Sequence, residues 1–271
     1  MCIRDSFYDR IGLAAIMLLL HTGHAVAVPP RHLCCGYPLL AAGMDTEYED
    51  NMAQNRQYLA SMLRNLVKQG FDVRYLATAC GSCRDSLARM KLDEQFPQLE
   101  QKDVSQIVLP LLQHENMEAP VAPGTSVLYH AACHCEWAGV PTLKGQAQLT
   151  GALEQLCKVK ISTIPGCCGE SGMGAVTSPT IYNLLRARKK ERLALAFEPQ
   201  PQTGACYAGP ILVGCPSCKI GIARCLIQLK EKHPVLHVLE WLANQVDGED
   251  RRQRFRRRAN ETRGDVRIVQ S

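Results

Sequence analysis

Cysteine motifs that occur twice are the residues of this sequence best suited to chemistry. The chain has 271 residues and 14 cysteines. Cys34-Cys35-Gly36 recurs as Cys167-Cys168-Gly169, and Cys80-x-x-Cys83 recurs as Cys215-x-x-Cys218, at offsets of 133 and 135 positions. An apolar content of 46% can form a core without disulfides. The pattern therefore favours metal ligation or thiol redox chemistry.

The second half of the chain has more thiols than a simple metal site requires. The five candidates are Cys133, Cys167, Cys168, Cys215 and Cys218. A tetrahedral zinc site or an ordinary cubane cluster uses four ligands, and adjacent cysteine side chains diverge. A larger multi-iron group fits better, with Gly169 allowing close approach of the backbone. Structural zinc, redox disulfides and inert buried cysteines remain the alternatives.

Helices that alternate with short apolar strands must position these thiols. Apolar residues at helical spacing predict helices over 48–69 and 179–195, the second with a face formed by Ile181, Leu184, Leu185 and Leu193. Strands are expected directly before the cysteine motifs, over 73–78, 126–130 and 210–214. Before Cys34 we expect a buried helix ending near Leu20 and then a strand from Ala25 to Val28.

This order of elements predicts an α/β fold. We expect two pseudo-repeated α/β domains with small parallel sheets and cysteine-bearing loops at the strand ends. The first domain is predicted over 7–117 and the second over 125–246. The linker is placed at 118–124, where two prolines and a closing glycine occur, and a basic tail at 247–271.

The charge distribution argues against a nucleic-acid partner. The net charge is +5, but 248–271 alone contain eight arginines and four acidic residues, so the rest of the chain is nearly neutral. The tail is expected to be disordered or to dock an acidic partner, with at most peripheral membrane association. His21, Gly23 and His24 interrupt the apolar run that begins at Ile11, too early for a membrane span. We therefore expect a cytoplasmic protein.

The motifs resemble those of the CCG-type cysteine-rich domain. The segment 129–134 (Tyr-His-Ala-Ala-Cys-His) is similar to the first-cysteine motif of this family, and the segment 164–169 (Ile-Pro-Gly-Cys-Cys-Gly) to its central motif. The domain occurs in the B subunit of heterodisulfide reductase and in iron-sulfur subunits of glycolate oxidase, anaerobic glycerol-3-phosphate dehydrogenase and lactate-utilisation proteins. The resemblance covers about 7–246, in two tandem copies.

The resemblance implies one or two 4Fe-4S clusters per chain, of the cubane or the noncubane kind. In the second half the implied ligands are the five cysteines named above. In the first half they are Cys34, Cys35, Cys80 and Cys83. The first half departs from the pattern at its leading cysteine, because Cys2 has the right spacing but no strand before it. Residues 1–6 resemble an assembly scar, so the first cluster is expected to be incomplete if Cys2 is not a ligand.

The resemblance also implies a function. We expect an electron-transfer module of a flavin-linked dehydrogenase for a small hydroxy acid such as lactate or glycolate. No flavin or nicotinamide motif is recognisable in the chain, so FAD and a ferredoxin-like iron-sulfur domain are expected on a missing domain or a partner, with a downstream electron acceptor. The alternatives are a catalytic thiol or disulfide reductase like heterodisulfide reductase, and a zinc-stabilised structural module.

Two histidines flank Cys133. His130 and His134 could each hydrogen-bond a cluster sulfur and tune its potential, or could be satisfied by neighbouring backbone groups. The cysteines without counterparts in the first half are interpreted as ordinary thiols: Cys135, Cys157, Cys206 and Cys225.

Overall fold

The computed structural model describes residues 9–29, 33–114, 125–134, 137–170, 174–199, 204, 206–248 and 253. The first half contains α2 (Asp9–His21), α3 (Tyr37–Ala41), α4 (Asp45–Lys68), β1 (Tyr75–Thr78), α5 (Gly81–Ala88), the short 3-10 helix η1 (Leu92–Glu94), β2 (Glu100–Asp103) and α6 (Val104–His114). The second half contains β3 (Ser126–His130), α7 (Thr142–Cys157), β4 (Lys160–Ile164), α8 (Gly174–Thr177), α9 (Pro179–Phe197), β5 (Ile211–Val213), α10 (Pro216–Leu229), β6 (Val235–His237) and α11 (Val238–Asp247).

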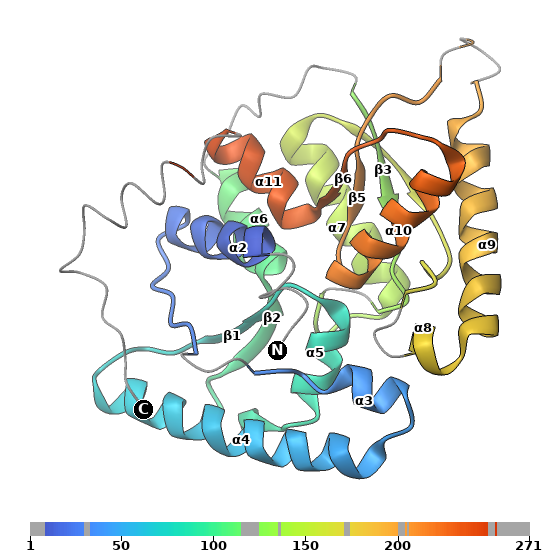
Figure 1. Ribbon diagram of the computed structural model, residues 1–271. Coiled ribbons are helices and arrows are strands. Elements are labelled where there is room, and N and C mark those ends of the chain that lie inside the picture. Colours follow the sequence, from blue (N-terminus) through green and yellow to red (C-terminus); the bar gives the residue numbers. More distant parts are fainter. Residues whose placement is uncertain are drawn as a thin grey trace.

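The strands of the described residues form two small sheets, and every pairing is parallel. In the first half β1 pairs with β2, and in the second half the order is β4-β3-β5-β6. Parallel neighbours need a crossover connection, which helices supply here (Figure 1). The central strands β3 and β5 are almost wholly buried, as expected for a sheet covered on both faces. The predicted α/β class with small parallel sheets is therefore confirmed.

The two halves follow one order of elements. The sequence α2, α3, α4, β1, α5, β2, α6 of the first half corresponds to α7, α8, α9, β5, α10, β6, α11 of the second. The predicted strand over 126–130 is β3, and the predicted strands over 73–78 and 210–214 are the slightly shorter β1 and β5. The buried helix near the start of the chain is α2. The strands β2, β4 and β6 (Val235–His237) were not predicted.

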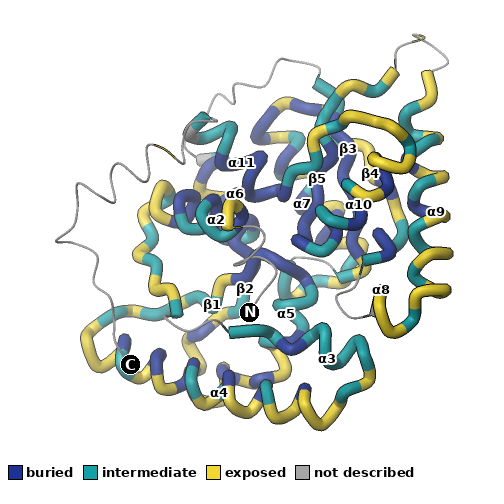
Figure 2. The backbone as a smooth tube through the Cα atoms, viewed as in Figure 1, coloured by how far each residue is buried: buried dark blue, intermediate teal, exposed yellow. Residues whose placement is uncertain are grey.

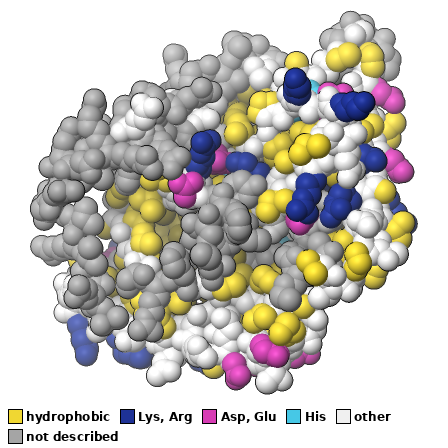
Figure 3. Space-filling view, in the orientation of Figure 1, with side chains coloured by type: hydrophobic (Ala, Val, Ile, Leu, Met, Phe, Trp, Pro, Cys, Tyr) yellow, Lys and Arg dark blue, Asp and Glu magenta, His cyan; other side chains and the backbone are white. Residues whose placement is uncertain are grey.

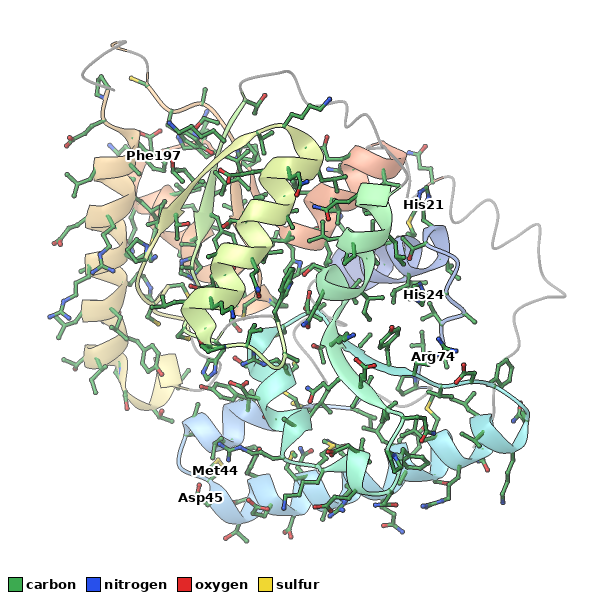
Figure 4. All side chains as sticks on the ribbon, turned by 180° about the vertical axis from the view of Figure 1, so that it is seen from behind. His21, His24, Met44, Asp45, Arg74 and Phe197 are labelled. Carbon is green, nitrogen blue, oxygen red and sulfur yellow. The ribbon has the colours of Figure 1, made fainter. Side chains whose placement is uncertain are left out.

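The predicted strand from Ala25 to Val28 is wrong. This segment has no strand structure, and Val28 is 58% exposed. Its counterpart β4 has β3 as its neighbour, and among the described residues of the first half no strand takes that place beside 25–28. Without that neighbour, a strand here would lack its ladder of hydrogen bonds. The chain instead runs from α2 through His24 toward β1 (Figure 4). The rings of His24 and Tyr75 lie 6.0 Å apart.

One hydrophobic core is shared by the two halves. Helix α2 packs against α11, and α6 packs against α7, so helices in equivalent positions of the repeat each contact the other half (Figure 1). Leu18, Leu109 and Leu242 are fully buried there, together with Leu149 and Leu153 of α7. The domain limits at 7–117 and 125–246 stay a prediction, because the linker at 118–124 and nearly all of the basic tail lie outside the described residues.

The predicted apolar face is confirmed for one of the two long helices and wrong for the other. Helix α4 buries Met52, Leu59 and Leu63, in agreement with the helical spacing. The prediction for α9 is wrong, because Ile181 and Leu184 are 59% and 60% exposed and of the four only Leu193 is fully buried. Helix α9 lies at the outer edge of the second half, where it packs on α8, α10 and β4 (Figure 2).

None of the helices among the described residues combines the length and the apolar character that crossing a membrane requires.

The shared core predicts that the halves unfold together. We expect Leu109→Ala in α6 to lower the free energy of unfolding by about 2–5 kcal/mol, because a fully buried leucine is removed. Denaturant unfolding followed by fluorescence and by circular dichroism should show one transition, shifted to lower denaturant. Leu111→Ala on the same helix is the control, since Leu111 is 37% exposed and its loss should cost much less. Two separate transitions would contradict a shared core.

Candidate metal centre

The cysteine loops lie at the carboxyl ends of parallel strands. Cys133 follows β3, Cys167 and Cys168 follow β4, and Cys215 follows β5. These strands are neighbours in one sheet, so their ends bring the four residues to one edge. In the first half Cys80 follows β1 in the same way.

Each Cys-x-x-Cys motif begins a helix. Cys80 is the N-cap of α5 and Cys215 is the N-cap of α10, both with extended backbone. Neither cap side chain makes a capping hydrogen bond, but the backbone N–H groups of Cys83 and Cys218 act to lower the pKa values of Cys80 and Cys215. The hydrogen bond from Cys80 to Cys215 outweighs this effect at Cys80 and raises its pKa to about 12. A helix N-terminus carries partial positive charge, which favours thiolate over thiol.

The four first-half cysteines lie together. The Sγ atoms of Cys35 and Cys83 are 3.4 Å apart. Hydrogen bonds from the thiols of Cys34 and Cys83 lower the pKa of Cys35 to about 3, while the bond to Cys35 and burial raise the pKa of Cys34. The carbonyl of Cys34 accepts hydrogen bonds from two amides of α4, at 3.0 and 2.7 Å, those of Asn51 and Asn55.

The five second-half cysteines form a matching group. Hydrogen bonds from Cys133 and Cys168 lower the pKa of Cys167 to about 2. The hydrogen bond to Cys167 raises the pKa of Cys168 to about 12, and Cys168 is also hydrogen-bonded to Cys218. Cys168, Cys215 and Cys218 are buried, whereas Cys133 is exposed at the edge of the group.

The two groups meet at equivalent positions of the repeat. The Sγ atoms of Cys80 and Cys215 lie 3.7 Å apart, and both residues are buried. Hydrogen bonds from the thiols of Cys218 and Cys80 hold the pKa of Cys215 well below its usual value. The nine sulfurs therefore form one continuous line, in the order Cys34, Cys35, Cys83, Cys80, Cys215, Cys218, Cys168, Cys167 and Cys133.

The glycine of each Cys-Cys-Gly motif is required by its conformation and its surroundings. Gly36 has φ +75° and Gly169 has φ +69°, in the left-handed region that favours glycine. A Cβ atom at Gly169 would lie 2.8 Å from the backbone nitrogen of Arg186, and one at Gly36 would lie 2.7 Å from the Asn51 side chain. The tight turn allows the Gly169 N–H to donate to Cys167 Sγ at 3.4 Å.

A hydrogen-bonded triad joins the two halves beside Cys133. The hydroxyl of Tyr37 lies 2.7 Å from Nε2 of His134, and Nδ1 of His134 bonds the carboxylate of Asp85. If Asp85 is ionised it can only accept, so Nδ1 carries the hydrogen and Tyr37 donates to Nε2. His134 is therefore held by side chains of the other half, and sequence reasoning missed Tyr37 and Asp85.

His130 has a different partner. His130 is fully buried, and its Nδ1 lies 2.9 Å from Nζ of Lys189, which is itself buried in α9. Burial lowers the pKa of His130 to about 3, helped by the charge of Lys189, and burial lowers the pKa of Lys189 to about 8. The ligand atoms of His130, Cys168 and Cys218 lie within 4.8 Å of one another.

An ion-pair network covers the loop that carries Cys168. Glu170 pairs with Arg224 at 2.6 Å and with Arg186 at 3.6 Å, and Arg186 also donates to the carbonyl of Gly169 at 3.1 Å. Lysine and arginine side chains gather on this face, over α9 and α10 (Figure 3). The network ties the Cys-Cys-Gly loop to both helices.

The site fits an iron-sulfur cluster better than a single ion. Its donors are all thiols, which suit iron-sulfur clusters and zinc, and nine in one line exceed what one tetrahedral ion uses. The buried Nε2 of His130 has no hydrogen-bond partner among the described atoms, as expected of a group that faces an additional acceptor. The cysteines of each half could hold one cluster.

Three other described cysteines do not belong to this line. Cys157 and Cys225 are buried in the apolar clusters, and Cys206 is exposed. Cys2 and Cys135 lie outside the described residues.

Comparison with known proteins agrees with the doubled cysteine pattern. The model of the CCG family, described as a cysteine-rich domain, matches residues 1–88 and 127–223. The chain belongs to this family. The two matched regions contain all nine cysteines of the continuous line of sulfurs, four in the first region and five in the second.

Similar proteins cover nearly the whole chain. Lactate utilization protein A of Exiguobacterium sp. is 24% identical over 261 residues, which span 89% of this chain and 94% of that protein. Proteins of the same name from Geobacillus thermodenitrificans and Macrococcus caseolyticus are 25% and 23% identical, over 71% and 91% of this chain and 79% and 95% of their own lengths. No solved structure gave a significant match.

The glycine of the second CCG motif gives a prediction. Gly169→Ala should lower stability by more than the roughly 1–2 kcal/mol of a left-handed alanine, because its Cβ also meets the backbone of Arg186 and Tyr182. Unfolding midpoint and bound metal should both fall. Gly139→Ala is the matched control, since Gly139 has φ +75° with nothing within 4 Å of an added Cβ. Equal losses in the two variants would contradict the close approach at Gly169.

Proposed function

We propose that this chain is an iron-sulfur electron-transfer module of a lactate-utilisation system. The observation that carries the proposal is the continuous line of nine sulfurs, which crosses from one repeat to the other at Cys80 and Cys215. The names of the similar proteins support lactate as the substrate of the system. The ligands are proposed to be the first four sulfurs of the line for one cluster and the last five for the other.

The chain would hold and shield the clusters while a partner carries out the oxidation. A bound iron-sulfur cluster accepts and donates electrons singly. Cys80 and Cys215 place the two proposed sites in direct contact, so an electron entering at one has a short route to the other. The buried residues around them exclude water, and the helix N-termini at Cys80 and Cys215 stabilise negative charge.

The partners of this module follow from what lactate oxidation requires. Oxidation of a hydroxy acid removes two electrons and two protons, which a flavin can accept before passing electrons on singly. We place the FAD and a ferredoxin-like iron-sulfur domain on partner chains or further domains, and a separate acceptor downstream.

A second candidate is reduction of a disulfide at the second cluster. Cys133 is exposed and lies beside the Tyr37–His134–Asp85 triad, so a substrate could reach this end of the line. Such a reaction would add two electrons and two protons to a disulfide and release two thiols. Turnover of a small disulfide with a supplied reductant would favour this activity over passive transfer.

The iron and acid-labile sulfide content of protein purified without oxygen tests the leading proposal. We expect about four irons per chain if one site assembles and about eight if both do. The double variant Cys167→Ser, Cys168→Ser should lose the second-half cluster and its visible absorbance. The pair Cys34→Ser, Cys35→Ser should lose only the first-half cluster.

Cys206→Ser is the control for cysteine loss alone, because Cys206 is exposed and lies outside the line. Its metal content should match that of the unaltered protein. Zinc in place of iron, without visible absorbance, would overturn the electron-transfer proposal and favour a structural module.

A further inference from the structure

A lysine is buried behind the second group of cysteines. Lys189 lies in the middle of α9 and is 1% exposed. Buried lysines are rare because a charged ammonium loses its hydration, so those that occur are held by hydrogen bonds. Nζ of Lys189 donates to the carbonyls of Ile164 at 3.2 Å and Pro165 at 2.7 Å, and its third contact is His130 Nδ1 at 2.9 Å.

Three acceptors match the three hydrogens of an ammonium. An ammonium has no lone pair, so His130 must accept the third hydrogen bond at Nδ1. A neutral imidazole that accepts at Nδ1 carries its hydrogen on Nε2. The Nε2 atom is buried without a partner, and one ring nitrogen of His130 lies within 4.8 Å of the sulfurs of Cys168 and Cys218. Because Nδ1 is occupied by Lys189, Nε2 is the nitrogen left for a group bound at these sulfurs.

We propose that Lys189 is a positioning residue that keeps His130 as an N–H donor to the sulfurs of the second cluster and out of the iron ligand set. An iron-bound Nε2 would need its lone pair there and a hydrogen on Nδ1, pointing at the hydrogens of Lys189. The inference rests on the proposed cluster. It adds that the thiols alone bind the iron, although His130, Cys168 and Cys218 by themselves have the spacing of a metal site.

The expected consequence is a raised reduction potential. Hydrogen bonds to cluster sulfur and nearby positive charge stabilise the more negative, reduced state. Lys189 supplies the charge, and through His130 it orients the donor. The opposite arrangement, a neutral amine that accepts from Nδ1–H, would leave the Nε2 lone pair free for iron.

Pulsed electron paramagnetic resonance of the reduced protein, labelled with 15N-histidine, tests the ligand assignment directly. We expect only the weak nitrogen coupling of a hydrogen bond, and its loss in His130→Ala with the iron content unchanged. A strong coupling from a directly bound nitrogen, or loss of iron in His130→Ala, would overturn the inference. Absence of iron from the unaltered protein would instead contradict the proposed function, so the two failures are distinguishable.

The midpoint potential tests the role of Lys189. In Lys189→Met we expect a negative shift equivalent to about tenfold in the reduction equilibrium, or about 59 mV for one electron. Lys190→Met is the matched control, because it removes a charge from the next position of α9 and should leave the potential nearly unchanged. An unchanged potential in Lys189→Met would contradict the inference.

A second pair of variants covers the case in which Lys189→Met does not fold. His130→Gln keeps an N–H donor and His130→Leu removes it, with side chains of similar size. We expect the glutamine variant to recover part of the potential that the leucine variant loses. Equal potentials in the two variants would contradict a donor at this position.

Discussion

The contact between Cys80 and Cys215, with sulfurs 3.7 Å apart, is the constraint on which the rest of the structure depends. Both residues are N-caps, so the contact requires the N-termini of α5 and α10 to face each other. Those helix ends follow β1 and β5, which belong to different sheets. The packing of α2 on α11 and of α6 on α7 therefore determines whether the two groups of thiols meet.

This arrangement explains why the core is shared between the halves. A pair of independent domains would bury separate cores and leave their relative position to a linker. Here apolar side chains from both halves interdigitate, and polar contacts next to the site add to them. Trp137 donates to the hydroxyl of Ser105 at 2.9 Å, and the side chain of Gln106 exchanges two hydrogen bonds with the backbone of Ala138.

Several polar groups near the sulfurs are held by identified hydrogen-bond partners. His134 is oriented by Asp85 and Tyr37, and His130 is oriented by Lys189. Lys219 of α10 pairs with Glu240 of α11, whose carboxylate also accepts the backbone N–H of His237. In a buried site such fixed groups have strong effects, because little water is present to screen them. These residues therefore bring fixed charges and dipoles to the surroundings of the proposed clusters.

The amino-acid sequence by itself determined the repeat, the cysteine motifs and most of the element types. The motifs recur in register, and local patterns such as the strand at 126–130 depend on short-range preferences that the fold retains. The predicted strand at Ala25–Val28 was wrong because a strand requires a neighbouring strand to pair with. The predicted buried face of α9 was wrong because the burial of a helix face depends on which elements pack against it.

Only the tertiary structure decided how the site is assembled. Nothing local indicates that Cys80 contacts Cys215, since 135 positions separate them and their contact depends on the packing of four helices. Lys189 resembles the other basic residues of α9, although its position four residues before the buried Leu193 was a signal that sequence reasoning did not use. Its environment comes from β4 and β3, because hydrogen-bond partners are set by three-dimensional proximity rather than by sequence spacing.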